Sequence, residues 1–304
     1  MICDVGCKMK KRNIALLTTL ACIAGCSGCM YSQYQAAFGP GKTMDETARI
    51  LVHDFKFGMR ATQKAIQNGD DILPSIQKEL EDYTILNGRN SFWIADVLGA
   101  IQTDRSRAML TDLYSRTNAI ARLTGAIGLA RHKALPDPID ENSFLVHNVR
   151  TDPNQTETQL SIIALGWTKD EKALPCLLSL LKQRPIDYWH HAYACEALAR
   201  IGSKQAIPIL RDCLKSEQFY ALPSAFRTLI SLGDRDAVPL AIARVTPEIK
   251  DKNTGFIVRE LKKVTGKSYG YDHDKWQKWW DSVRDKWQIP EEFTKPWDEQ
   301  EEMY

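Results

Sequence analysis

The stretch that decides the fold reads Ala197-Leu198-Ala199-Arg200-Ile201-Gly202 and, after a short polar turn, Ala206-Ile207-Pro208. The first part has the apolar spacing of a helix and ends at a glycine, the usual residue just past a last helical turn. A proline can stand near the start of the next helix because first-turn N–H groups have no partner inside the helix. The stretch therefore predicts two helices joined by a tight turn.

Two further copies appear when the chain is aligned on Gly166 and Gly233, each followed by a polar turn and an Ala-aliphatic-Pro triplet. Gly99 and Gly128 end similar but weaker copies earlier in the chain. In the clear copies the second helix carries apolar residues on one face, so it offers an apolar stripe to a neighbour. One helix pair cannot bury such a stripe alone, whereas stacked pairs can.

A helix that ends in Ala-Leu-x-x-Ile-Gly and is followed by Ala-aliphatic-Pro resembles the HEAT repeat family, most clearly between residues 157 and 246. The resemblance implies an α-solenoid, which is a superhelical stack of antiparallel helix pairs. The rest of the chain shows helical spacing and almost no alternation of period two, which also favours an all-α protein. The predicted fold class is therefore an all-α, HEAT-like solenoid.

The sequence also predicts how the chain is organised. Thr43 begins a capping box and opens a helix expected from Met44 to about Gln67. Five apolar residues near the C-terminus share one helix face and favour a cap over the last repeat, against the alternative of a sugar-binding platform; they are Trp276, Trp279, Trp280, Val283 and Trp287. The expected segments are 43–135, degenerate helical repeats; 136–156, a loop; 157–287, HEAT-like repeats with the capping helix; and 288–304, a solvated acidic tail.

Residues 9–26 have the layout of a secretory signal: a basic stretch, an apolar run and small residues before Cys26. The apolar run from Ile14 to Ala24 is shorter than the roughly 20 residues that a transmembrane helix needs. Because a well-formed signal begins at Met9, that residue is an alternative start. The predicted signal peptide is 1–25.

The end of this signal, Ile23-Ala24-Gly25-Cys26, resembles the lipobox of bacterial lipoproteins. The resemblance implies that Cys26 is acylated and becomes the new N-terminus, with residues 26–42 as a lipid-anchored linker. It also implies a location in the cell envelope, with the outer membrane favoured and the folded part facing the periplasm.

Composition and motifs argue against several functional classes. A net charge of +2 lacks the electrostatic footprint of a nucleic-acid-binding protein. His191 and Cys195 lie four residues apart on a predicted helix, but a zinc site usually needs three or four ligands. The sequence has no Gly-x-Ser-x-Gly elbow, nor the His-Glu pairs of the deoxyhypusine hydroxylases, which are also HEAT solenoids. We therefore expect no metal, no cofactor and no catalytic activity.

The remaining cysteines of the folded part are predicted to be small core residues, and their pairing is left open. They are Cys176, Cys195 and Cys213.

The predicted function is a protein-protein interaction scaffold tethered to the membrane, with a protein or peptide partner in the cell envelope. Lys182, Arg211 and Lys215 lie opposite the apolar stripes of the second helices and are the candidate partner-binding residues, unless they are merely solvated. The alternative function resembles that of the HEAT-like bilin lyases. In that case a small molecule or metal would bind in a pocket lined by Tyr188, Trp189, His190 and His191.

Overall fold

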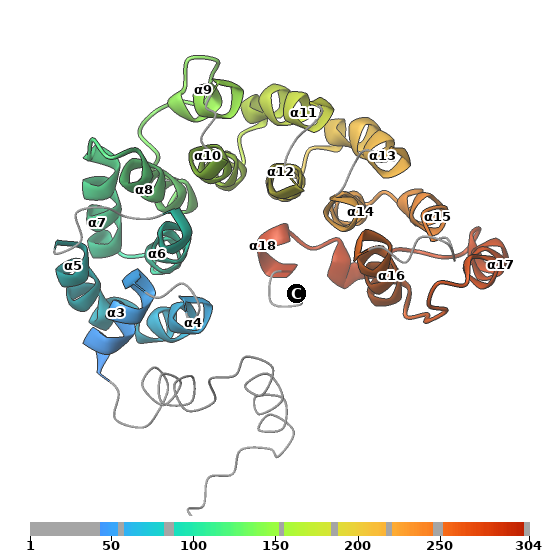
Figure 1. The fold of residues 1–304 in the computed structure, drawn as a ribbon, viewed down its shortest axis with the longest axis horizontal. Helices are drawn as coiled ribbons and strands as arrows, with labels where there is room; N and C mark the ends of the chain where they lie inside the picture. Colours follow the sequence, from blue (N-terminus) through green and yellow to red (C-terminus); the bar gives the residue numbers. More distant parts are fainter. Residues whose placement is uncertain are drawn as a thin grey trace, which may run out of the picture. The chain divides into compact units, whose positions relative to one another are not determined.

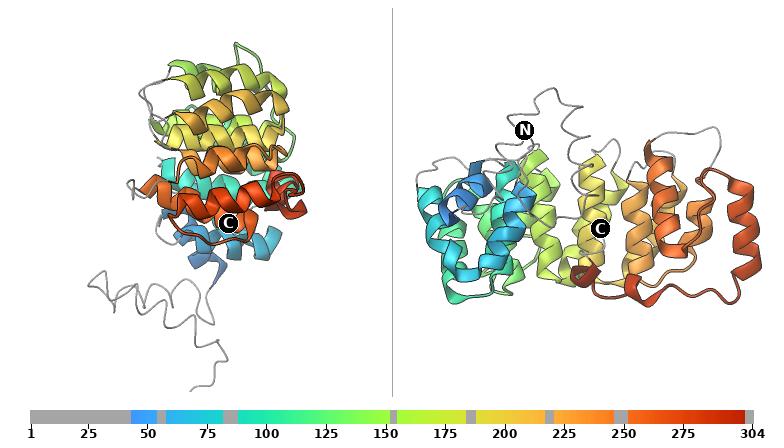
Figure 2. Two further views of the ribbon diagram at one scale, coloured as in Figure 1. Left: turned by 90° about the vertical axis from the view of Figure 1, so that its right-hand side faces the viewer. Right: turned by 90° about the horizontal axis from the view of Figure 1, so that it is seen from below.

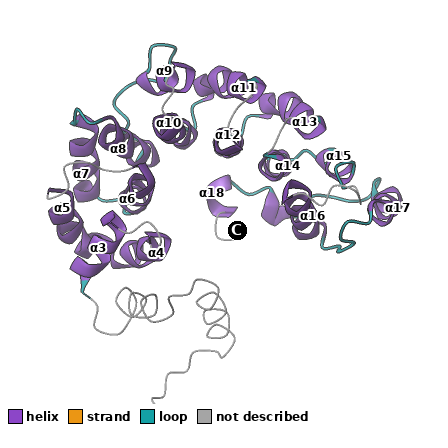
Figure 3. Ribbon diagram, viewed as in Figure 1, coloured by secondary structure: helices purple, strands orange, loops and turns teal. Residues whose placement is uncertain are grey.

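The computed structural model describes residues 43–53, 58–81, 88–151, 155–183, 188–216, 221–245 and 252–300. These residues form helices and turns and contain no strand, as an all-α fold requires (Figure 3). The predicted signal peptide, the linker and Cys26 lie outside the described residues. Within them, no helix combines the length and apolar character needed to cross a membrane.

The chain divides into two compact units, residues 1–84 and 85–304. The segment 43–135, which the sequence suggested as one helical part, therefore crosses the boundary between them. In the first unit, Met44 begins a helix as predicted, with Thr43 Oγ1 accepting a hydrogen bond from the Glu46 N–H. The expected single helix is wrong, however, because α3 and α4 are separate helices that pack against each other. The described helices of this unit are α3 (Met44–His53), α4 (Gly58–Asn68) and α5 (Leu73–Glu81).

The second unit is a solenoid of two rows of helices (Figure 1). Most helices pack on the next member of their own row and on a partner in the other row, and the helices lie side by side (Figure 2). The even row consists of α6 (Gly88–Ala100), α8 (Ala119–Arg131), α10 (Gln155–Thr168), α12 (Tyr188–Ile201), α14 (Leu222–Ser231) and α16 (Lys252–Thr265). The odd row consists of α7 (Asp104–Ser115), α9 (Phe144–Thr151), α11 (Leu174–Lys182), α13 (Ile207–Lys215), α15 (Ala237–Ile242) and α17 (His273–Val283).

The repeat pattern in the sequence corresponds to a buried core within this unit. Leu177 and Leu181 of α11 are buried, as are the equivalent Leu210 and Leu214 of α13. Burying one such leucine contributes about 1.5–3 kcal/mol, so the regular stripe supplies much of the stacking free energy.

The glycines on which the copies were aligned have two different roles. Gly202 and Gly233 follow helices and have φ angles of 75° and 82°, a region that favours glycine. Gly166 instead lies inside α10, where a Cβ atom would come within 2.7 Å of the Cα of Ala197 on α12. The expectation that Gly166 ends a helix is therefore wrong. So are the same expectations for Gly99 and Gly128, which lie inside α6 and α8.

The predicted loop 136–156 contains a helix of the odd row. Helix α9 packs on α10 and α11, with Leu145, Val146 and Val149 buried. The Asp137-Pro138 step lies in the connection before α9 and does not interrupt the stack. Only the first part of the predicted loop is therefore irregular among the described residues.

The tryptophans of α17 lie at the end of the second unit and pack on one another. Trp276 is completely buried, and its ring Nε1–H donates a hydrogen bond of 2.9 Å to the Gly270 carbonyl. Trp279 and Trp280 are also buried, while Trp287, which was expected in the same helix but lies beyond its end at Val283, contacts Trp280 in an edge-on arrangement. Side chains buried in this way have no open face on which to bind a sugar.

The chain after α17 does not form the predicted solvated tail over residues 288–300. A short 3₁₀ turn, η4 (Glu291–Phe293), leads to α18 (Trp297–Gln300), which packs on α12 (Figure 1). Phe293 and Trp297 are only 8% and 5% exposed. Two aromatic side chains in the acidic stretch therefore fold back onto the even row.

Candidate partner-binding surface

The even-row helices α8, α10 and α12 are followed by a residue in the left-handed region, which gives their ends a common register. The φ angles are 54° at Lys133, 54° at Lys169 and 75° at Gly202. Counting back two residues from each places Arg131, Trp167 and Arg200 at equivalent positions. Because neighbouring helices of one row are stacked, equivalent positions come together.

Trp167 lies between the two arginines that share its register. The guanidinium carbons of Arg131 and Arg200 are 4.3 Å and 4.5 Å from the centre of the Trp167 ring. A cation over a tryptophan ring gains about 0.5–2 kcal/mol, with the larger value for desolvated pairs. Arg131 also forms an ion pair with Asp96 of α6, and Arg200 lies 3.9 Å from Glu196 of its own helix.

Charged side chains continue onto α14 and α16, although the α14 residue in the same register is Ser231 and Arg227 lies earlier in the helix. Arg227 Nε lies 3.9 Å from a carboxylate oxygen of Glu260, whose side chain is only 2% exposed. Arg259 and Lys263 lie 3.5 Å and 3.8 Å from the same carboxylate. We call Arg131, Trp167, Arg200 and Arg227 the arginine ladder.

The C-terminal segment supplies an aromatic ring and a carboxylate to this ladder. The guanidinium carbon of Arg227 lies 5.0 Å from the centre of the Trp297 ring. Asp298 accepts a 2.5 Å hydrogen bond from Lys169 Nζ and lies 3.8 Å from Arg200 Nε. The ladder is therefore a surface with the chemistry to hold aromatic and acidic side chains together.

Sequence reasoning missed the ladder, although its signal is present in the sequence. Aligning Gly166 with Gly202 places Trp167 opposite Ser203, and the match between Trp167 and Arg200 is lost. Aligning Lys169 with Gly202 restores it, because both lie four residues before the alanine of an Ala-aliphatic-Pro triplet.

The three cations predicted to bind a partner all lie on the odd row. Lys182 and Lys215 are exposed at the ends of α11 and α13. Arg211 is 34% exposed and is held by two acidic partners. Its guanidinium donates hydrogen bonds of 2.7 Å and 2.5 Å to Asp234 and one of 2.8 Å to Asp236.

The hydrogen bond to Asp234 raises the pKa of the Arg211 guanidinium above its ordinary value. Because Asp234 is buried, Arg211 mainly joins α13 to the turn before α15. Its role in partner binding stays a prediction, as do those of Lys182 and Lys215.

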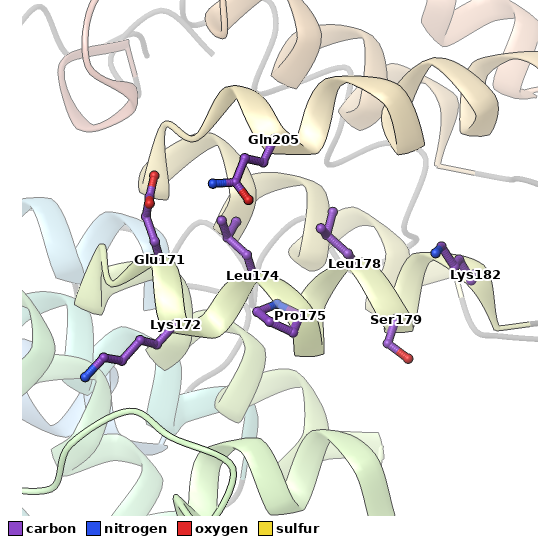
Figure 4. A pocket seen from close by; sticks show the side chains of 8 residues that line it. All are labelled: Glu171, Lys172, Leu174, Pro175, Leu178, Ser179, Lys182 and Gln205. Atoms are coloured by element: carbon purple, nitrogen blue, oxygen red, sulfur yellow. The ribbon is translucent and has the colours of Figure 1, made fainter.

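A shallow groove of about 610 Å³ lies along α11, with Lys182 at one end. Figure 4 shows Gln205, from the 3₁₀ turn η3 (Lys204–Ala206), reaching over Leu174, while Leu178 lines the middle. Its lining side chains are Glu171, Lys172, Leu174, Pro175, Leu178, Ser179, Lys182 and Gln205. The groove is open and lacks a cluster of converging polar groups.

The four residues of the alternative pocket do not all face one side of α12. Consecutive residues of a helix point about 100° apart. Trp189 is 54% exposed and stacks on Tyr193, whereas His190 and His191 are buried. Tyr188 is half-buried and makes an edge-on contact with Trp189. The histidines and the aromatic rings thus face different surroundings.

The three cysteines of the folded part belong to its core. Cys176, Cys195 and Cys213 are buried, and none of them forms a disulfide. Burial raises the pKa of the Cys176 and Cys195 thiols, which keeps them neutral near pH 7. Within the described ranges, no three His, Cys, Asp or Glu side chains gather closely enough to hold a metal ion.

Helix pairs stacked in two rows, with a ladder of side chains along one row, define an α-solenoid. More specifically, residues 142–222 match the family model for HEAT repeats, from just before α9 to the start of α14. HEAT repeats commonly mediate protein–protein interactions. Comparison with curated proteins gave no significant match.

Proposed function

We propose that this chain is a lipid-anchored HEAT-like solenoid that binds a protein partner in the bacterial cell envelope, without catalytic activity of its own. The observation that carries the binding role is the arginine ladder, which lies on three successive helix ends and on α14. Regular display of this kind is how solenoids build extended binding surfaces. The match of residues 142–222 to HEAT repeats supports the same role.

The anchor in this proposal is Cys26. The lipobox-like Ile23-Ala24-Gly25-Cys26 and the short apolar run before it support acylation at this residue. Bacterial lipoproteins carry several acyl chains, and more than one chain is needed for stable anchoring. We propose that the solenoid faces the periplasm, with the outer membrane as the favoured location.

Metabolic labelling with a clickable fatty acid tests the anchor. We expect the label and the membrane-bound fraction to be lost in Cys26→Ser and kept in the matched control Cys29→Ser, because only Cys26 ends a lipobox. Label that persists in Cys26→Ser would show that the anchor is elsewhere or absent.

Photocrosslinking in the anchored chain tests the binding role. A benzoylphenylalanine at Lys204, an exposed position just after Arg200, reports on the arginine ladder, and one at Lys215 reports on the odd row. We expect a discrete protein adduct from position 204 that is lost when Arg131 and Arg200 are both changed to glutamine. Adducts from position 215 alone would place the partner on the odd row and contradict the proposal.

A further inference from the structure

The described part of the C-terminal segment, residues 288–300, contacts the solenoid through a small set of side chains. In the stretch from Glu291 to Glu299 only Phe293 and Trp297 are buried, and Asp298 is half-buried. Glu291, Glu292, Thr294, Lys295, Pro296 and Glu299 are exposed. The segment thus has the form of a linear peptide, with two aromatic anchors four residues apart and acidic residues around them.

The helix in this segment depends on its docking site. Helix α18 comprises four residues, whereas isolated helices shorter than about 12 residues are marginal in water. Its position is set by the contacts of Trp297 with Arg227 and of Asp298 with Lys169 and Arg200. These residues come from three different even-row helix regions, so the segment crosses successive repeats as a bound peptide would.

Charge complementarity indicates which other peptides would fit the docking site of this segment. The segment has acidic residues at positions 291, 292, 298 and 299 and one lysine at 295, and it lies against Lys169, Arg200 and Arg227. Arginine is suited to this combination because its planar guanidinium both stacks on aromatic rings and pairs with carboxylates.

We propose that the arginine ladder recognises an acidic protein segment in which a tryptophan is followed by carboxylates, and that residues 291–300 occupy the same site as an intramolecular competitor. This inference rests on the proposed function, because it names the chemistry of the partner that the solenoid binds. A tethered segment competes at an effective concentration of about millimolar, so a partner displaces it only by binding more tightly or through added contacts.

A fluorescein-labelled peptide with the sequence of residues 289–300 serves as the probe in fluorescence polarisation with the detergent-solubilised full chain. Asp298→Lys vacates the site, because it removes the pair with Lys169 and places like charges beside Arg200. The matched control is Asp285→Lys, which makes the same charge change at an exposed position. We expect at least ten-fold tighter peptide binding to Asp298→Lys than to the wild-type chain or to the control.

A second pair of variants tests the site itself. Trp297→Ala should also open the site, and adding Arg200→Gln to it should abolish peptide binding while leaving the circular dichroism spectrum unchanged. A scrambled peptide that separates the tryptophan from the carboxylates should bind at least ten-fold more weakly. Equal binding of the scrambled peptide, or binding that survives Arg200→Gln, would overturn the proposed recognition.

Hydrogen exchange shows whether the segment has been released. If residues 291–300 stay protected in both Asp298→Lys and Trp297→Ala, the segment is a permanent part of the core and the competitor role is refuted. If they are released and the peptide still binds no more tightly, the recognition role is refuted. Both readouts use the purified chain, so they are independent of acyl labelling and of partner crosslinking.

Discussion

Replacing Gly166 by alanine tests the close packing of α10 against α12. A Cβ atom at this position would lie 2.7 Å from Ala197 Cα and 2.9 Å from its Cβ, and one of these contacts is with backbone. Overpacking of this kind costs about 1–3 kcal/mol. We expect Gly166→Ala to lower the free energy of unfolding by about that amount, measured by urea denaturation followed by circular dichroism.

The matched control is Gly255→Ala in α16. There the new Cβ would meet only the Tyr271 hydroxyl, at 3.0 Å, and this is the far end of a flexible side chain. Alanine is favoured over glycine in a helix by about 1 kcal/mol, so this variant should be neutral or slightly more stable. Equal destabilisation by both variants would show that the contact with Ala197 is unimportant.

The same residue shows what the sequence could and could not predict. A glycine at the end of an apolar helical run can stop the helix, as Gly202 does, or can let another helix approach, as Gly166 does. In both roles the sequence shows the same residue, a glycine after an apolar helical run, so the sequence does not distinguish them. The stacked helix pairs were still predictable, because the apolar stripes do not depend on which role each glycine has.

At the scale of one element, a substitution in α17 tests how much the terminal helix contributes to the stability of the second unit. Trp276 is completely buried and its indole N–H is bound to the Gly270 carbonyl. Replacing a buried aromatic side chain by alanine typically costs about 3–5 kcal/mol. We expect Trp276→Ala to destabilise the second unit by that amount, with a lower melting temperature in calorimetry.

Trp189→Ala is the control for this change, because it removes the same side chain from a position that is 54% exposed. Surface substitutions usually change stability by less than about 0.5 kcal/mol. A loss of stability at Trp189 as large as that at Trp276 would mean that burial does not explain the effect.

Elements differ in how far the sequence predicts them. Helix α17 is predictable because its tryptophans recur at helical spacing and share one face. Helix α9 and the docked segment were missed for a physical reason: both are short, and their order comes from packing on other helices, α9 on α10 and α11 and α18 on α12. The arginine ladder was missed for the related reason that it depends on the register between helices.

At the scale of the whole molecule, the second unit has contacts mainly between neighbouring helices. Stability in such an array is approximately a sum of local terms, so a change at one place should act locally. We expect hydrogen exchange of Trp276→Ala to rise in α15 and α17 but to remain at the wild-type level in α8 and α10. In Gly166→Ala the rise should instead fall in α8, α10 and α12.

The first unit provides an internal reference, because α3, α4 and α5 form their own compact unit. Their exchange should be unchanged in both variants. An equal rise across all helices from α6 to α17 would show that the second unit unfolds as one cooperative body. In that case a partner bound at the arginine ladder would protect α17 from hydrogen exchange as strongly as α12. If stability is local, the partner protects only the helices that it touches.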